Sequence, residues 1–193
     1  MELLPLAFTS GWTSGINAYA TVLILGLLGR FAGTEDIPAG LQRTDVLIAA
    51  AVLTVIEFVA DKVPYVDSIW DGGSTVVRPI AGAVIGALLA GGSGDLVTLT
   101  LASVGGVTAL VSHLVKAGLR LAINTSPEPA SNIGASLAGD VSVAGVTAFA
   151  VLNPAVAAVL VAVLLVAGIW LTIAAMGRVR RGWGAFRRWM QPA

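Results

Sequence analysis

Residues Val55 to Gly86 read V-I-E-F-V-A-D-K-V-P-Y-V-D-S-I-W-D-G-G-S-T-V-V-R-P-I-A-G-A-V-I-G. This stretch is rich in charged side chains, although the chain as a whole is 56% hydrophobic and only 11% charged, with a mean hydropathy of +0.90. A charge inside a membrane span costs at least about 2.5 kcal/mol on insertion scales, so it normally has a partner or a function. The stretch therefore predicts a membrane protein with a polar site between its spans.

The apolar runs along the chain predict an all-α, polytopic transmembrane helix bundle of about six spans. Those with few or no charges are 21–28, 46–63, 76–90, 96–115, 133–152 and 155–175. A span needs roughly 20 apolar residues, so we expect a single transmembrane domain over residues 1–177, followed by a basic amphipathic cytoplasmic tail over residues 178–193. The first run is short and follows several polar residues, so its segment can be a re-entrant or broken helix.

The cations are distributed unevenly between the two sides of the expected bundle. An even number of spans puts both termini on one side, and the five arginines of the tail assign that side to the cytoplasm by the positive-inside rule. Of the 11 lysines and arginines, only Arg30 and Arg43 then lie outside. The chain has no cysteine, which excludes disulfides and thiolate metal sites.

Two carboxylates of the opening stretch, Glu57 and Asp61, are four residues apart and share one face of a helix. At that spacing two carboxylates repel each other in a low dielectric, so one of them can hold a proton at neutral pH. We expect Glu57, Asp61 and Asp140 to carry a coupling proton or cation. The alternative is a structural role, in which Lys62 or a cation of the fourth span pairs with them.

A second set of polar residues is expected to bind an anionic substrate. It comprises Asn17, Ser74, Thr75, Arg78, His113, Lys116, Arg120 and Asn132. Ser74 or Thr75 is expected to cap the third helix, and Ser131 or Asn132 the fifth. Two helix N-termini beside these cations would form an anion site, whereas the alternative is ordinary capping with cations that reach toward the interface.

Asp67 and Asp71, which precede Gly72 and Gly73, form another carboxylate pair at a spacing of four residues. With Glu57 and Asp61 they could bind Mg²⁺ or another hard cation, as in a metal-dependent intramembrane enzyme that acts on a lipid or isoprenoid phosphate. The alternative is that both aspartates are turn residues. Outside the enzyme hypothesis no cofactor is expected. The chain has one histidine, so a zinc site with two histidine ligands is excluded.

Small-residue motifs and weak internal repeats indicate how the expected helices pack. The motifs Gly11-x-x-x-Gly15 and Gly82-x-x-x-Gly86 allow helices to approach closely, and glycine-rich faces favour a homo-oligomer. A weak repeat pairs residues 57–86 with residues 113–140. A different alignment pairs residues 14–30 with residues 104–120 and would give a three-plus-three inverted repeat, which is common in transporters.

Three runs carry a resemblance to a known family: G-W-T-S-G-I-N-A-Y-A-T, E-F-V-A-D-K-V-P-Y-V-D-S-I-W-D and S-T-V-V-R-P-I-A-G-A. With them the chain resembles, from about Phe8 to Ala174, an uncharacterised bacterial family of multi-pass membrane proteins that is known only as a domain of unknown function. The resemblance implies an integral protein of the bacterial inner membrane and no established activity or site residues.

These patterns favour a small transporter or translocase for an anionic substrate, either a lipid phosphate or a small organic anion, coupled to protons or cations. The intramembrane enzyme and a non-catalytic scaffold are the alternatives. The expected partners are the bilayer, the anion and a second copy of the chain, with no nucleic acid. We expect the side chains of Glu57, Arg78, His113, Arg120 and Asp140 to point into one polar cavity in the cytoplasmic half.

Overall fold

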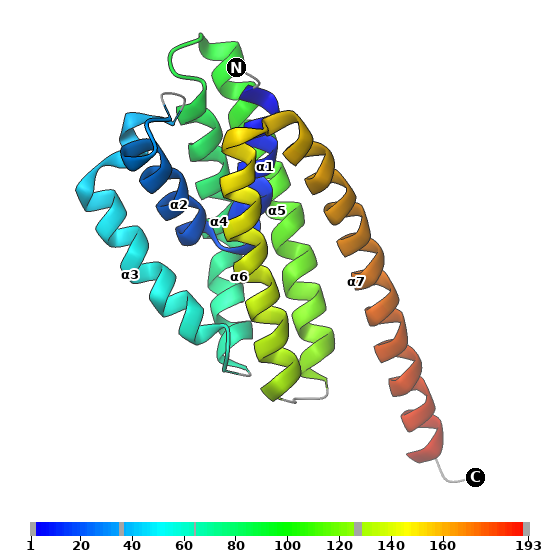
Figure 1. Cartoon of the computed structure of the whole chain (residues 1–193). Coiled ribbons are helices and arrows are strands. Elements are labelled where there is room, and N and C mark those ends of the chain that lie inside the picture. The colour runs from blue at the N-terminus through cyan, green and yellow to red at the C-terminus, as the bar shows by residue number, and fades with distance from the viewer. Residues whose placement is uncertain (1–2, 35–36, 64, 126–128, 191–193) are drawn as a thin grey trace.

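The computed structural model describes residues 3–34, 37–63, 65–125 and 129–190, without the side chains of Pro129 and of residues 184–190. Its elements are α1 (Leu3–Ile16), α2 (Ala18–Phe31), the 3-10 turn η1 (Ala39–Gln42), α3 (Thr44–Ala60), α4 (Val66–Leu89), α5 (Asp95–Asn124), α6 (Pro129–Leu152) and α7 (Pro154–Met190). Every regular element in this part of the chain is helical (Figure 1). The expected all-α helical bundle is confirmed.

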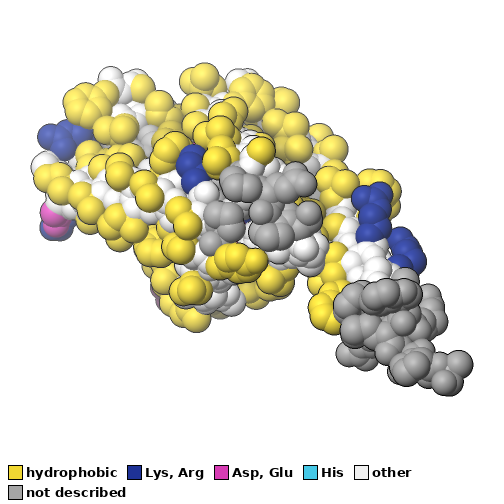
Figure 2. Space-filling view, turned by 90° about the horizontal axis from the view of Figure 1, so that it is seen from below, with side chains coloured by type: hydrophobic (Ala, Val, Ile, Leu, Met, Phe, Trp, Pro, Cys, Tyr) yellow, Lys and Arg dark blue, Asp and Glu magenta, His cyan; other side chains and the backbone are white. Residues whose placement is uncertain are grey.

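The surface and the helix lengths are those of a membrane protein. Four helices are long and apolar enough to cross a membrane, namely those at Val66–Leu89, Asp95–Asn124, Ala130–Leu152 and Pro154–Trp183. Seen from the end toward which α7 projects, the molecule shows mostly hydrophobic side chains (Figure 2). Helix α3 has 17 residues, which is near the lower limit of about 17 for a span.

Helices α1 and α2 form a helical hairpin. Helix α1 runs from one end of the bundle to its middle, and α2 returns toward the same end (Figure 1), so that Leu6 and Leu25 belong to one apolar cluster. Each helix has 14 residues and is therefore only about 21 Å long. At the tip, extended Asn17 caps α2, because its Oδ1 accepts a hydrogen bond of 2.9 Å from the Ala20 amide.

The hairpin determines how the two ends of the chain lie in the bundle. The first segment enters and leaves at the same end, whereas α3 to α7 then run alternately along the bundle, so the N-terminal and C-terminal ends lie at opposite ends (Figure 1). The expectation that both termini share one side of a membrane stays a prediction. Its basis was a count of apolar runs, and hydropathy does not show where a chain turns back inside the bundle.

Glycine contacts bring α1, α4 and α5 together at the centre. A Cβ atom on Gly11 would lie 2.5 Å from the carbonyl oxygen of Gly105, and one on Gly82 would lie 2.6 Å from the same oxygen. The three backbones are therefore in direct contact, as the small-residue motifs predict. This packing fixes the register between α4 and α5, which carry most of the buried charges.

Helix α4 begins earlier than expected. It starts at Val66, so Ser74 and Thr75 lie inside it and are not its N-cap, and Pro79 lies in its interior. The segment with Asp67 and Asp71, which sequence alone assigns to a loop or turn, is helical. Both aspartates lie on the buried face of the helix with Ser74 and Arg78, where ion pairs offset their low helix propensity.

Helix α7 is continuous from the apolar segment into the basic one and projects beyond the bundle (Figure 1). No break marks the boundary expected at residue 177. The amphipathic character expected for residues 178–193 depends mainly on side chains outside the described residues. The two similar segments 57–86 and 113–140 each contain the end of one helix and the beginning of the next, at the same end of the bundle (Figure 1), whereas segment 14–30 contains the break at Asn17 and segment 104–120 is unbroken.

Candidate functional site

Buried charged side chains gather where α3, α4 and α5 meet the tip of the α1–α2 hairpin. This charge cluster comprises Glu57, Asp61, Asp67, Asp71, Arg78, His113, Lys116 and Arg120. The most exposed of them is Lys116, whose side chain is 12% accessible. Spacings of three, four and seven residues place the members of each helix on its inward face, and the antiparallel α4–α5 pair puts their opposite charges side by side.

Arg78 connects three elements at the centre of the charge cluster. Its guanidinium forms ion pairs with Glu57 and, at 3.0 Å, with Asp71 Oδ1. Its Nη1 also donates to His113 Nδ1 at 2.7 Å and lies 3.5 Å from the carbonyl oxygen of Gly15. With only 1% of its side chain exposed, Arg78 cannot exchange these partners for water.

The contacts of His113 define its protonation. A guanidinium only donates hydrogen bonds, so Nδ1 must accept from Arg78 and the ring is neutral, with its proton on Nε2. That Nε2 lies 3.0 Å from Thr75 Oγ1, which donates in turn to the carbonyl oxygen of Asp71 at 3.0 Å. Both ring nitrogens are thus engaged within the cluster, and neither is available for a metal ion.

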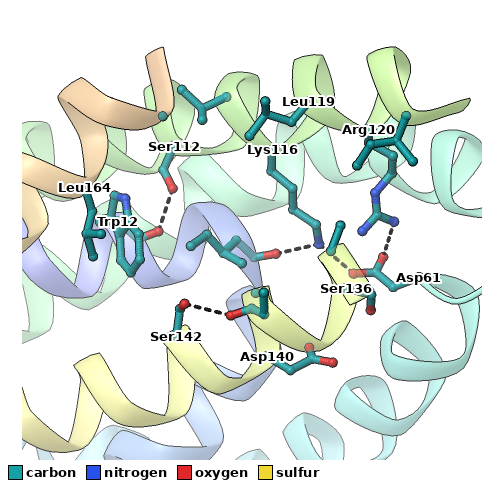
Figure 3. A pocket seen from close by; sticks show the side chains of 17 residues that line it. Trp12, Asp61, Ser112, Lys116, Leu119, Arg120, Ser136, Asp140, Ser142 and Leu164 are labelled. Atoms are coloured by element: carbon teal, nitrogen blue, oxygen red, sulfur yellow. Dashed lines mark hydrogen bonds and ion pairs between the residues drawn. The ribbon is translucent and has the colours of Figure 1, made fainter. Parts of the chain in front are cut away.

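Asp61, at the C-cap of α3, is held by two cations of α5. Its Oδ2 lies 2.7 Å from Lys116 Nζ and its Oδ1 lies 3.0 Å from Arg120 Nη1 (Figure 3). Arg120 also approaches Asp67 Oδ2 at 3.6 Å and Asp71 Oδ2 at 3.5 Å. The ion pairs that sequence predicts between the carboxylates and cations of the fourth span are therefore present.

The hairpin tip is fastened to the charge cluster through backbone carbonyls. Lys116 Nζ donates to the carbonyl oxygen of Ile16 at 2.8 Å, and Ser112 Oγ donates to that of Trp12 at 2.8 Å. The last carbonyls of a helix have no partner within it and form the negative end of its dipole. The C-terminal end of α1 is therefore stabilised by the cations Lys116 and Arg78.

The charges of the cluster do not balance. It contains four carboxylates and three cations, because His113 is neutral, so full ionisation would leave one excess negative charge. Glu57 Oε2 and Arg78 Nε have no hydrogen-bond partner among the described residues, and the oxygens of Asp71 have ion pairs without hydrogen-bond geometry. A buried polar atom without a partner costs about 1–3 kcal/mol, so a proton on one carboxylate would relieve both the excess charge and an unpaired oxygen.

Asp140 lies apart from Glu57, in a separate pair at the rim. Its Oδ2 is 3.2 Å from Lys62 Nζ, which is also 3.2 Å from Ser136 Oγ. The side chains of this pair are 19% and 22% exposed. The expectation that five charged residues share one cavity is therefore met only in part, because Glu57, Arg78 and His113 form a closed set while Arg120 and Asp140 line an open cavity.

This cavity lies between α1, α5, α6 and α7 and has a volume of about 250 Å³. Asp61, Lys116 and Arg120 lie toward one end of it, and Trp12 and Leu164 toward the other (Figure 3). The remaining lining is mostly apolar and comprises Ile16, Val115, Leu119, Ile123, Ala135, Ala138, Gly139 and Gly168, with the polar Ser112, Ser136, Asp140 and Ser142. It is thus a cavity with one charged end.

Two predicted arrangements are not formed. The anion site between two helix N-termini is absent, because α4 begins at Val66, two turns before Ser74. Asn132 is buried in the first turn of α6, and both of its amide atoms are unpartnered in the described chain. Asn17 caps α2 and so belongs to the tip of the α1–α2 hairpin. Among the described residues, no three His, Cys, Asp or Glu side chains are grouped to hold a metal ion, since arginines occupy the position beside Asp67 and Asp71.

The sequence analysis did not identify several residues that take part in the charge cluster and the cavity. Asn124 donates to Asp67 Oδ1 at 3.1 Å and to Ser68 Oγ at 3.0 Å, and its position four residues after Arg120 was a usable signal because it shares that helix face. No sequence pattern indicated the role of the carbonyls at the hairpin tip or the position of Trp12 in the cavity, because both depend on the reversal of the chain at Asn17.

The charge cluster lies within a region that matches one family model. Residues 4–174 match the model described as Domain of unknown function (DUF4126). The chain belongs to this family. The DUF4126 region extends from α1 into α7 and includes the charge cluster and the cavity, while the basic end of α7 lies beyond it. No curated protein and no solved structure matches the chain.

Proposed function

We propose that the protein is a membrane transporter that moves an anionic substrate together with a proton, and that Asp61 couples the two. The observation that carries this proposal is the position of Asp61 at the charged end of the open cavity. Lys116 and Arg120 each hold one of its carboxylate oxygens, at 2.7 and 3.0 Å. A phosphate or carboxylate of a substrate would use the same two cations in the same way.

Protonation provides the coupling. While Asp61 is ionised, it occupies the two cations, and a second anion beside it would add to a cluster that already has more carboxylates than cations. Once Asp61 is protonated, its attraction to Lys116 and Arg120 is largely lost, and an anion can take its place. Substrate and proton then bind together, and their release restores the ion pairs of Asp61 with Lys116 and Arg120.

The α1–α2 hairpin supports a transport function. Helices that end within the membrane are tolerated where they are buried in protein or line a cavity, and transporters commonly place such ends beside their substrate and ion sites. Here the C-terminal carbonyls of α1 bind Lys116 and Arg78. A movement of the hairpin would therefore change the partners of the cations that receive the substrate.

The positive-inside rule suggests the orientation. The basic end of α7, with Arg178, Arg180 and Arg181, lies at the same end of the bundle as Lys62, whereas Arg30 and Arg43 lie at the other. We propose that the former end faces the cytoplasm of a bacterial inner membrane and that the N-terminal hairpin enters from the opposite side. We also propose a homo-oligomer, because the glycine-rich faces of the sequence favour the close approach of helices from two copies.

Proton uptake on binding tests the proposal. The purified protein in weakly buffered detergent is titrated with inorganic phosphate, octyl phosphate and lysophosphatidic acid, while the pH is recorded. We expect the protein to take up close to one proton for each anion that it binds. The affinity for the anion should rise up to about tenfold for each unit by which the pH falls. An affinity that is independent of pH for every anion that binds would refute the coupling.

Variants assign the effect to one carboxylate. Asp61→Asn should bind anions without proton uptake, because Lys116 and Arg120 are then already released. Asp140→Asn is the matched control, since Asp140 lines the same cavity but pairs with Lys62, and it should retain the proton uptake. If every charge has only a structural role, neither variant binds anions more tightly than the wild type and both merely lose stability.

A further inference from the structure

The shape of the cavity identifies the class of substrate more narrowly. Its charged end is formed by Asp61, Lys116 and Arg120, but most of its lining is apolar. Along α5 it extends from Ser112 to Ile123, which is a length of about 16 Å at 1.5 Å per residue, and Lys116 and Arg120 lie within this length. A small anion would contact the charged residues alone and leave the apolar remainder of the lining unused.

The cavity also opens toward the bilayer. Gly168 and Thr172 of α7 contact α5, where a Cβ atom on Gly168 would lie 2.8 Å from Val115 and Thr172 Oγ1 lies 3.4 Å from the Val115 carbonyl oxygen. Beyond these contacts α7 diverges from α5 and α6 (Figure 1). Ala135 and Ala138 of α6 line the cavity and are exposed, so a hydrocarbon chain in the bilayer has a lateral route between α6 and α7.

Solvation favours a substrate that already resides in the membrane. A hydrophilic anion from water would have to give up its hydration to enter an apolar cleft, which is costly. A lipid brings its chain from one apolar environment to another and needs compensation only at its head group. The charged end lies toward the C-terminal end of α5, at the proposed cytoplasmic side, where the head groups of the inner leaflet are found.

We propose that the cavity binds a membrane lipid with a phosphate head group, which enters from the bilayer between α6 and α7. The chain lies along α5 toward Trp12 and Leu164, and the phosphate replaces Asp61 on Lys116 and Arg120. Arginine matches the geometry of phosphate oxygens, and the arrangement gives each cation one oxygen. This inference rests on the proposed function for the release of the two cations by protonation of Asp61.

Fluorescence of Trp12 tests the site directly, because this residue lines the apolar end. The changes Trp70→Phe, Trp170→Phe, Trp183→Phe and Trp189→Phe leave it as the only tryptophan. The variant, in detergent, is titrated with lysophosphatidic acid brominated on its chain. We expect saturable quenching that the unbrominated lipid reverses and that an equal concentration of inorganic phosphate does not. A brominated monoacylglycerol, which lacks the phosphate, should bind at least about tenfold more weakly.

A matched pair of variants localises the lipid. Ala138→Phe fills the cavity from its exposed side and should weaken quenching by the brominated lipid at least about tenfold. Leu137→Phe, at the adjacent position outside the cavity lining, should leave it unchanged. Equal effects of the two changes, or quenching that does not saturate, would overturn the lipid site.

The outcomes separate this inference from the proposed function. Proton uptake with inorganic phosphate, without quenching of Trp12 by the brominated lipid, would overturn the lipid substrate and leave the coupled transporter intact. Quenching that is reversed by the unbrominated lipid but occurs without proton uptake would support the lipid site and contradict the coupling through Asp61.

Discussion

Removal of the Arg78 guanidinium should destabilise the protein more than removal of any exposed cation. Its side chain is 1% exposed, and it pairs with Glu57 and Asp71 while donating to His113. Arg78→Met retains much of the length of the side chain but leaves two buried carboxylates and one ring nitrogen without this donor. Breaking a buried ion pair by removing one partner costs about 3–5 kcal/mol, and we expect a loss of free energy of unfolding in that range.

Equilibrium unfolding in mixed micelles with increasing dodecyl sulfate measures the loss. Arg30→Met is the control, because Arg30 is exposed and its side chain donates only to Thr44 among the described polar groups, and it should change the unfolding free energy by less than about 0.5 kcal/mol. The double variant Arg78→Met with Glu57→Gln should be more stable than the sum of the two single losses predicts, by about 0.5–3 kcal/mol. A loss below about 1 kcal/mol for Arg78→Met, or strict additivity, would refute the central role of this arginine.

Three further predictions concern packing, topology and the rim. Gly105→Ala should cost about 1–3 kcal/mol of unfolding free energy, because its Cβ would press on the backbone of α4, whereas Gly145→Ala, which has open space around it, should be neutral or slightly stabilising. Single cysteines at Leu4 and Gly182 should be labelled by a membrane-impermeant thiol reagent from opposite sides of the membrane, and labelling of both from one side would contradict the hairpin. Lys62→Met should cost less than about 1 kcal/mol, because its pair with Asp140 is partly exposed, and a loss as large as that of Arg78→Met would show that the rim pair belongs to the buried core.

Part of the site could be predicted from the sequence because the cost of a buried charge is independent of the details of the fold. Glu57 and Asp61 needed partners, and the structural alternative named Lys62 or a cation of the fourth expected span. Lys116 and Arg120 of that span do pair with Asp61, whereas the pair of Glu57 with Arg78 of α4 was not predicted. The family resemblance agreed with the matched region, residues 4–174, but contained no mechanism.

The errors have a common physical origin, which is that tertiary contacts override local signals. Asp67, Asp71 and the following glycines favour a turn when read alone, but ion pairs with Arg78 and Arg120 make the segment helical. The polar residues of α1 suggested a weak span, and hydropathy could not show that the chain reverses at Asn17. The cavity between α5, α6 and α7 depends on where α7 diverges, which no local pattern encodes.

The most direct test of the account follows the protonation of Asp61 itself. Infrared difference spectra of the protein with and without bound octyl phosphate, an alkyl phosphate that has no carbonyl group of its own, report carboxylates that become carboxylic acids. The account predicts that binding produces one protonated carboxyl band, that the band is lost in Asp61→Asn, and that it persists in Asp140→Asn. Binding of octyl phosphate without such a band, or a band that persists in Asp61→Asn, would contradict the claim that Asp61 gives up its place on Lys116 and Arg120 to the substrate.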